Sequence, residues 1–246
     1  MSIEYELFKH IGKKPCSPNS PRAVRCPLVI NETSEDLLTG NIFGRLKYLN
    51  AGIWLIPLLE SIFKGRSFNA IAGSKIRIEF WKKLSAPPTT SQREGIEEID
   101  IVIRIRHWIV LIECKLKSSV NMGRIGSLVR DQLARYLDAA TFNYWPDSGT
   151  EREIYLILLT DTECEPEILS RYRNPKTVLA CLTQARPFVD YDRVSEMLAR
   201  NIGWTTWRNL LQILERQNLK EVSEVEAMII KDLIQYLKYK FDRRQF

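Results

Sequence analysis

The chain has 246 residues, a formal net charge of +6 and an isoelectric point near 9.0. Hydrophobic residues make up 45% of it and charged residues 27%, which excludes a disordered or fibrous chain and fits an ordinary globular protein. The mild positive charge allows a polyanionic partner but does not require one. No apolar run reaches the roughly 20 residues of a membrane span, so we expect no membrane segment.

The cysteines and the first residues indicate a compartment. The five cysteines are scattered and form no CxxC motif, so we interpret them as reduced thiols. The opening segment, MSIEYELFKHIGKK, carries charges throughout and does not resemble a signal peptide. We therefore expect a cytoplasmic protein.

We expect residues 1–30 to form an irregular basic arm, because they are rich in Pro, Ser and Lys/Arg. A helical segment, 31–63, should follow, with Thr33 or Ser34 as its N-cap. Its apolar residues recur at helical spacing and should pack on a sheet: Leu37, Leu38, Ile42, Leu46 and Leu49. Glu35 and Asp36 occupy the first turn, where carboxylates cap a helix or interact with its dipole.

Residues 74–84 alternate as a strand does. Ile76, Ile78 and Phe80 share one face, and Arg77, Glu79 and Trp81 share the other. A loop with two prolines, residues 85–95, leads from this strand to the next.

The stretch 98–117, EIDIVIRIRHWIVLIECKLK, predicts two apolar strands joined by a hairpin at about Arg106-His107. Alternation gives Ile109, Leu111, Glu113 and Lys115 one face, and Val110, Ile112 and Cys114 the other. A carboxylate and an ammonium therefore emerge side by side at the end of an apolar strand. If the hairpin closes, Asp100 lies beside them.

Two carboxylates this close repel each other unless a cation lies between them. Oxygen ligands without a His or Cys cluster suit Mg²⁺ or Mn²⁺. A lysine beside the ion can hold or deprotonate a water molecule, or stabilise a developing phosphorane charge. The alternative is a solvated strand end with a surface ion pair.

The pattern of Asp100 followed by a hairpin and Glu113-Cys114-Lys115 resembles the motif of the PD-(D/E)XK nuclease superfamily. Ile99 stands where that motif often has proline, a position that varies widely in the superfamily. The resemblance implies a metal site made by Asp100, Glu113 and the Cys114 carbonyl. It also implies an acidic residue on the preceding helix, for which we choose Glu35, with Asp36 and Glu32 as rivals.

A helix is expected from about Arg124 to Phe142, with Gln132 and Tyr136 one turn apart on one face. DQLARYL resembles the QxxxY element of RecB-like nucleases, in which the Gln lies near the active site and the Tyr supports it or meets DNA. The alternative is a boundary residue of an amphipathic helix. Lys117, Arg130 and Tyr136 are our candidate nucleic acid contacts, and Arg130 and Arg135 could instead form a solvated face.

Residues 151–160 and 177–184 are two further apolar runs of strand length, and the last sixty residues show helical periodicity. The expected fold is α/β, with a restriction-endonuclease-like core, 31–190, in which helices flank a mixed central sheet. A helical extension, 191–246, should pack on this core. Asp161, after the later strand, is a weak further ligand or a helix cap.

These expectations describe a Mg²⁺- or Mn²⁺-dependent nuclease that acts on DNA. Lys115 would orient or activate the attacking water, and Gln132 would lie beside the metal ligands. The resemblance extends to bacterial PD-(D/E)XK proteins of unassigned role, several families of which work in restriction or phage defence. The expected partners, besides DNA, are a second copy of the chain in a homodimer or another protein that works in defence. A nucleic-acid-binding module without turnover and an adaptor subunit remain alternatives.

Overall fold

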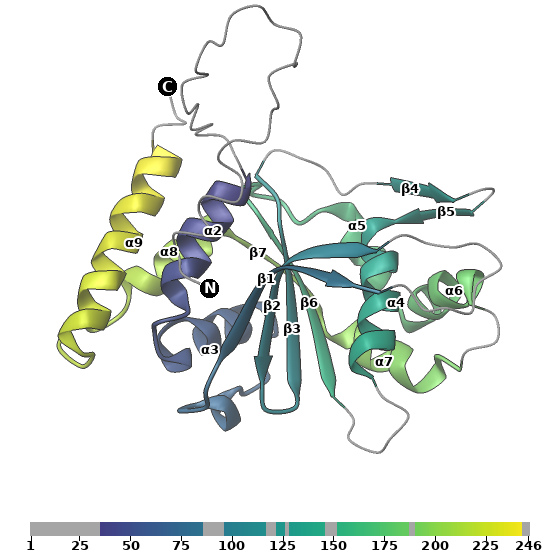
Figure 1. The fold of residues 1–246 in the computed structure, drawn as a ribbon, viewed down its shortest axis with the longest axis horizontal. Helices are drawn as coiled ribbons and strands as arrows, with labels where there is room; N and C mark the ends of the chain where they lie inside the picture. The colour runs from purple at the N-terminus through teal and green to yellow at the C-terminus, as the bar shows by residue number, and fades with distance from the viewer. Residues whose placement is uncertain are drawn as a thin grey trace, which may run out of the picture.

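The computed structural model describes residues 35–85, 96–116, 122–125, 128–145, 152–186 and 190–242. The basic arm, Glu32, the expected N-caps and Lys117 lie outside these ranges. The fold is α/β, with a mixed five-stranded sheet between helices, as the sequence predicts (Figure 1). No helix in the described ranges is long and apolar enough to cross a membrane.

The sheet has the order β1 (Arg77–Leu84), β2 (Glu97–Ile105), β3 (Trp108–Cys114), β6 (Glu153–Thr160) and β7 (Ile202–Thr206). The first three strands are antiparallel, whereas β3, β6 and β7 are parallel. The β2–β3 turn lies at the predicted position, and Arg106 adopts a left-handed backbone there, with φ +52°. The C-terminal ends of β3, β6 and β7 therefore lie at the same end of the sheet.

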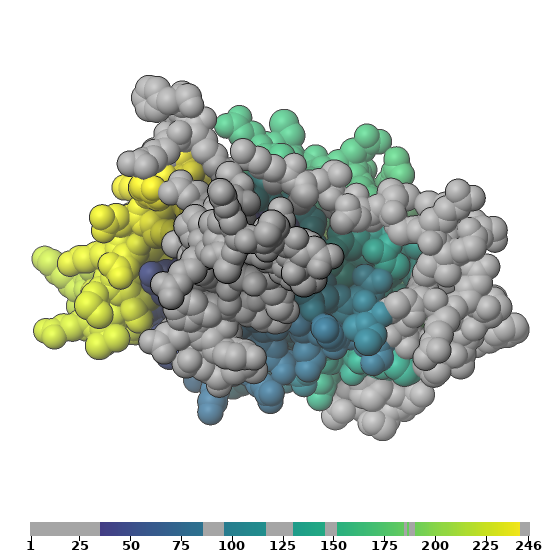
Figure 2. Space-filling model, turned by 45° about the horizontal axis from the view of Figure 1, so that its top comes forward, coloured from purple at the N-terminus to yellow at the C-terminus, as the bar shows by residue number. Residues whose placement is uncertain are grey.

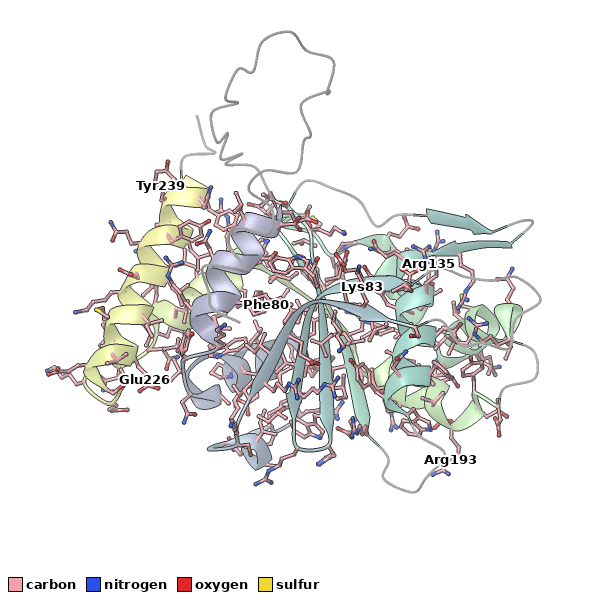
Figure 3. The ribbon with its side chains drawn as sticks, in the orientation of Figure 1. Phe80, Lys83, Arg135, Arg193, Glu226 and Tyr239 are labelled. Atoms are coloured by element: carbon pink, nitrogen blue, oxygen red, sulfur yellow. The ribbon has the colours of Figure 1, made fainter. Side chains whose placement is uncertain are left out.

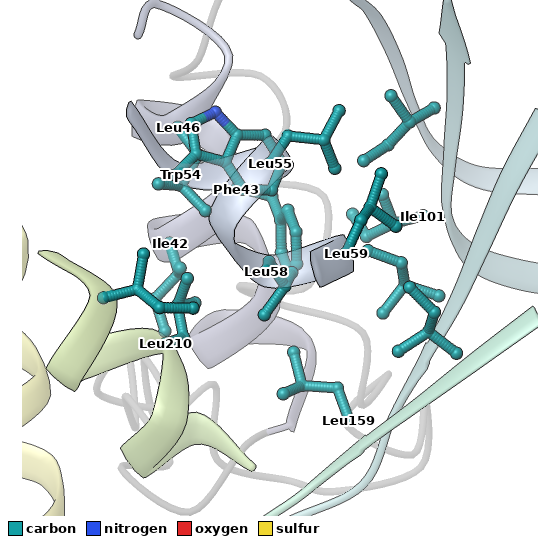
Figure 4. Packing of buried hydrophobic residues seen from close by; sticks show 14 of the residues in the cluster. Ile42, Phe43, Leu46, Trp54, Leu55, Leu58, Leu59, Ile101, Leu159 and Leu210 are labelled. Carbon is teal, nitrogen blue, oxygen red and sulfur yellow. The ribbon is translucent and has the colours of Figure 1, made fainter. Parts of the chain in front are cut away.

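One face of the sheet is covered by α2 (Glu35–Leu46), α3 (Ala51–Ile62), α8 (Trp207–Glu215) and α9 (Glu224–Asp242). The Phe43 ring centroid lies 5.9 Å from that of Trp54 on α3, and both rings are seen in Figure 4. It lies 6.3 Å from that of Trp207 on α8, so three helices share one aromatic cluster. In the space-filling view, α9 forms one flank of the molecule (yellow, Figure 2).

The other face is covered by α4 (Gln132–Tyr144), α5 (Glu167–Tyr172), α6 (Pro175–Ala185) and α7 (Asp192–Arg200). Before α4, β4 (Met122–Ile125) and β5 (Leu128–Asp131) form a separate hairpin. A short 3₁₀ helix, η1 (Asn69–Ile71), precedes β1. The alternation predicted for β3 is confirmed, because Ile109 and Leu111 pack on the α4 side, and Val110, Ile112 and Cys114 pack on the α2 side.

Several expected element types are wrong. Residues 177–184 are helical, because Asn174 caps α6 through Lys176 N and buried residues such as Val178 and Leu182 recur at helical spacing. The helix expected from Arg124 begins only at Gln132, since β4 and β5 occupy the residues before it.

Two further boundaries differ from the expectation. The helical pattern over 31–63 is broken, and Asn50 caps a second helix by accepting a hydrogen bond from Gly52 N. Residues 202–206, expected to be helical, form β7 beside β6. This strand fits because Gly203 lets the end of α3 approach the sheet: a Cβ there would lie 2.2 Å from Ile62 Cγ2.

Along β1 and β2, the faces to which successive side chains point change at the position of Trp81 and Asp100. Trp81, which the sequence places opposite the Phe80 face, has φ +45° and packs against Gly40 of α2, with its ring 5.5 Å from that of Phe80. Beyond this point Leu84 and Ile99 face the α4 side. The predicted face of Trp81 is therefore wrong, because a left-handed residue turns the strand about its axis.

Candidate active site

The carboxylate of Asp100 lies where strands β2 and β3 separate. Their ladder ends at the pair Ile101 and Ile112, and continuing that register places Asp100 opposite Glu113. Asp100 Oδ2 accepts a hydrogen bond of 2.8 Å from Cys114 N, which has lost its partner on β2. The side chain thus replaces a strand carbonyl and is fixed beside Glu113.

Glu113 is held from two directions. Only 2% of it is exposed, and its Oε1 accepts hydrogen bonds from Lys115 Nζ at 2.5 Å and from Gln132 Nε2 at 3.0 Å. Its Oε2 is buried without a hydrogen bond in the described part of the chain. The nearby Tyr136 hydroxyl donates its proton to the Glu98 carbonyl, at 2.9 Å. A buried carboxylate oxygen without a donor is a position suited to a cation.

Lys115 lies between two carboxylates. Its Nζ is 2.5 Å from Glu113 Oε1 and 3.7 Å from Glu35 Oε1. Glu35, the first residue of α2, also accepts a hydrogen bond of 2.7 Å from Leu116 N through its other oxygen. Of the rival acidic residues that the structure describes, Glu35 makes these contacts. Helix α2 is thereby joined to the end of β3.

The first turn of α4 completes the cluster. Gln132 Nε2 contacts both Glu113 Oε1 and the Tyr136 hydroxyl, the latter at 2.5 Å. Asp131 caps the helix through Ala134 N and accepts a hydrogen bond from Tyr172. The predicted shared face of Gln132 and Tyr136 is confirmed.

Two of the candidate nucleic acid contacts are buried. Tyr136 is 1% exposed, so it supports Gln132 and offers no surface to DNA. Arg130 is 3% exposed, and its guanidinium lies 3.2 Å from Asp138 Oδ2 and donates to the Ala134 carbonyl. The phosphate contact predicted for Arg130 is therefore wrong, because its guanidinium is buried in an ion pair. Arg135, labelled in Figure 3, pairs with Glu97 at 2.7 Å.

The cluster carries three carboxylates and one ammonium. Burial, and then the charge of Glu113, raise the pKa of Asp100 from 3.8 to about 8. Burial also raises the pKa of Glu113, although Lys115 opposes the shift. Burial alone lowers the pKa of Lys115, but the neighbouring carboxylates more than offset this, so its pKa lies above the usual value. An added cation would relieve the repulsion between the carboxylates.

The donor set fits a magnesium ion with few protein ligands. In the described ranges, no three Asp, Glu, His or Cys side chains are arranged to hold a metal together. Asp100 and Glu113 remain as a facing pair, and Glu35 is already engaged by Leu116 N and Lys115. One or two carboxylates completed by water and substrate phosphate are typical of Mg²⁺ sites. Burial raises the pKa of the Cys114 thiol, which packs on the α2 side of β3.

The remaining candidates and the unpredicted contacts lie as follows. Asp161 lines a cavity beside β7, and the N-cap of the next helix, α5, is Pro166 and not Asp161. Glu98 and Leu116 take part in the cluster through a backbone carbonyl and a backbone N–H, for which the sequence has no signal.

Comparison of the chain with protein-family models, with curated proteins and with solved structures gives no match.

Proposed function

We propose that this protein is a metal-dependent nuclease that hydrolyses phosphodiester bonds, with DNA as its substrate. The proposal rests on one observation: Asp100, Glu113 and Lys115 lie together where β2 and β3 separate. Glu35, from a separate helix, lies beside them. Their residue types and order resemble the PD-(D/E)XK motif. A buried Glu113 and Lys115 beside a half-buried Asp100 have no need to exist for folding, since burying charge is costly.

Asp100 and Glu113 would hold Mg²⁺ or Mn²⁺, which when bound supplies a Lewis acid for the phosphate and lowers the pKa of a bound water. The raised pKa of Lys115 keeps it protonated at neutral pH. We assign Lys115 the role of donating hydrogen bonds to the attacking water or to the charged phosphate oxygens. Gln132 fixes the orientation of Glu113.

The helix ends support an anionic substrate. Glu35 and Gln132 are the first residues of α2 and α4, so the N-termini of two helices lie beside the carboxylates. The positive end of each helix dipole favours an anion at such a position, and on α4 the Asp131 carboxylate already caps Ala134 N. The negative carboxylates and the positive helix ends together suit a metal ion bridged to a phosphodiester.

A setting in restriction or phage defence and a partner defence protein are proposed from the resemblance alone. A homodimer is proposed for cleavage of both strands, since one chain of this size would cut one strand at a time. A binding subunit that cuts only with a partner is the second candidate. The direct contact of Lys115 with Glu113 favours this second candidate, because the ion pair must open before Lys115 can donate a hydrogen bond to a water molecule.

The test is cleavage of supercoiled plasmid by the purified full chain with Mg²⁺, Mn²⁺ or EDTA. Lys115→Ala should lower the cleavage rate by about 100-fold or more. Lys231→Ala, an exposed lysine on α9, is the matched control and should cut like the wild type. Equal cutting by Lys115→Ala would overturn the assignment, and no cutting with any metal by a folded protein would favour the binding subunit.

A further inference from the structure

Strand β7 is an edge of the central sheet, and no strand in the described ranges pairs with its outer side. Leu156 N donates to the Asn201 carbonyl, and the parallel register pairs Leu158 with Trp204. Backbone groups alternate sides along a parallel strand. The N–H and C=O groups of Ile202 and Trp204 therefore point away from β6, where an added strand would meet them, whereas Thr206 is the N-cap of α8.

A cavity of about 950 Å³ runs along this edge. It is lined by β7 itself, by the end of α3 and start of α8 on one side, and by the loop after β6 and the end of α7 on the other. Its lining extends from Arg66, which is bonded to Asn201 just before β7, to Asp161 just after β6. The cavity thus spans the length of the strand, and it shares no residue with the carboxylate cluster.

The walls of this cavity carry unpaired positive charge. Lys64, Arg200 and Arg208 line it, are exposed, and make no ion pair with any described residue. Arg173 is neutralised by Glu165. The remaining acidic side chains, Asp161 and Glu163, lie in the loop after β6, which forms part of one wall. Cations from both walls therefore face the space beside the free strand edge.

We propose that this groove binds an extended acidic peptide segment of another protein, which adds to β7 as a further strand. Main-chain hydrogen bonds to an edge strand give such peptides affinity, and flanking side chains give specificity. Five residues of β7 span roughly 17 Å, which matches a short peptide of similar length. The cations on both walls fit Asp or Glu on such a peptide.

A second copy of this chain is disfavoured as the occupant, because pairing two β7 edges would bring the same cations together. A nucleic acid would satisfy the cations but has no alternating N–H and C=O groups for the strand edge. The proposal goes beyond the nuclease function, since it concerns a partner protein and a separate site.

The test uses the full chain and fluorescein-labelled peptides of alternating Val and Glu. Matched probes are the Val/Lys peptide, a Val/Glu peptide with alternate amides N-methylated, and single-stranded oligothymidine. The Val/Glu peptide should bind saturably, whereas the Val/Lys and N-methylated peptides should not. The double variant Lys64→Glu/Arg208→Glu should weaken binding by at least about tenfold.

The control variant Lys220→Glu/Lys231→Glu makes the same charge change on exposed lysines outside the groove and should bind like the wild type. Equal binding of the N-methylated peptide, no binding of the Val/Glu peptide, or oligothymidine binding that is lost only in the groove variant would overturn the proposal. Lys115→Ala should lose cleavage and keep peptide binding, so failure of one proposal is distinguishable from failure of the other.

Discussion

Asp100 Oδ2 lies 2.8 Å from Cys114 N and takes the place that a β2 carbonyl would hold in a continuing ladder. The two strands separate at this point, opposite the left-handed residue Trp81 on β1. A buried N–H must be paired, and here the partner is a carboxylate. The end of the hairpin is therefore also the start of the candidate active site.

Asp100→Asn should stabilise the metal-free protein, and the gain should grow with pH. The folded-state pKa of Asp100, about 8, lies above its ordinary value of 3.8. Its stabilising contribution is therefore present at low pH and is lost as pH rises through about 8. Asparagine does not ionise but can still accept the Cys114 hydrogen bond, so we expect a gain on the order of 1–3 kcal/mol at pH 8.

Urea unfolding in EDTA at pH 5 and pH 8 measures this difference in the free energy of unfolding. Asp232→Asn, at an exposed carboxylate on α9, is the control and should not change the pH dependence. Parallel pH curves for Asp100→Asn and the wild type would contradict the prediction.

Mg²⁺ should raise the melting temperature of the wild type at pH 8. Binding to the folded state alone stabilises it by about 2.7 kcal/mol at one hundred times the dissociation constant. Glu113→Gln keeps the size of the side chain and removes the buried charge, so the shift with Mg²⁺ should disappear. Thermal melts over a Mg²⁺ titration are the measurement, and an unchanged shift in Glu113→Gln would place the ion elsewhere.

Gln132→Ala should lower the cleavage rate by about 10- to 100-fold, because it removes a donor that orients Glu113. It should also raise the Mg²⁺ concentration needed for half-maximal cleavage. Gln235→Ala, at an exposed position on α9, serves as the control. If the rate falls while the Mg²⁺ dependence stays the same, Gln132 acts on something other than the metal ligand.

Gly203→Ala should destabilise the protein by about 1–3 kcal/mol, because its Cβ would lie 2.2 Å from Ile62 Cγ2 and 3.0 Å from Phe63 Cζ. Gly44→Ala has no atom within 4 Å of the new Cβ and lies inside α2. It should instead stabilise by about 0.5–1 kcal/mol through helix propensity. Chemical unfolding compares the two, and a neutral Gly203→Ala would show that α3 can move away from β7.

Local periodicity was enough to predict which residues share a face of the central strand β3 and of helix α4. The alternation of β3 predicted that Glu113 shares a face with Ile109 and Leu111, and the four-residue spacing placed Gln132 beside Tyr136. Both follow from backbone geometry within one element, so distant residues do not alter them. The α/β class followed from the order of the elements along the chain, although the strand expected at 177–184 is helix α6 and β7 is the fifth strand.

Other features depended on contacts between distant parts of the chain. The apolar run 177–184 suits a strand or a helix, and a cap at Asn174 and burial beside α4 made it α6. Residues 202–206 became a strand because β6 offered an open edge and Gly203 admitted α3. Short apolar runs are ambiguous in this way, since tertiary packing decides between the two periods.

The sequence by itself determined the chemistry of the cluster: which carboxylates, which lysine, and which strand end carries them. Only the tertiary structure brought Glu35 to Leu116, buried Arg130 against Asp138, and turned β1 at Trp81. The physical reason is that hydrogen bonding and alternation act over a few residues, whereas burial depends on every element that packs against a side chain.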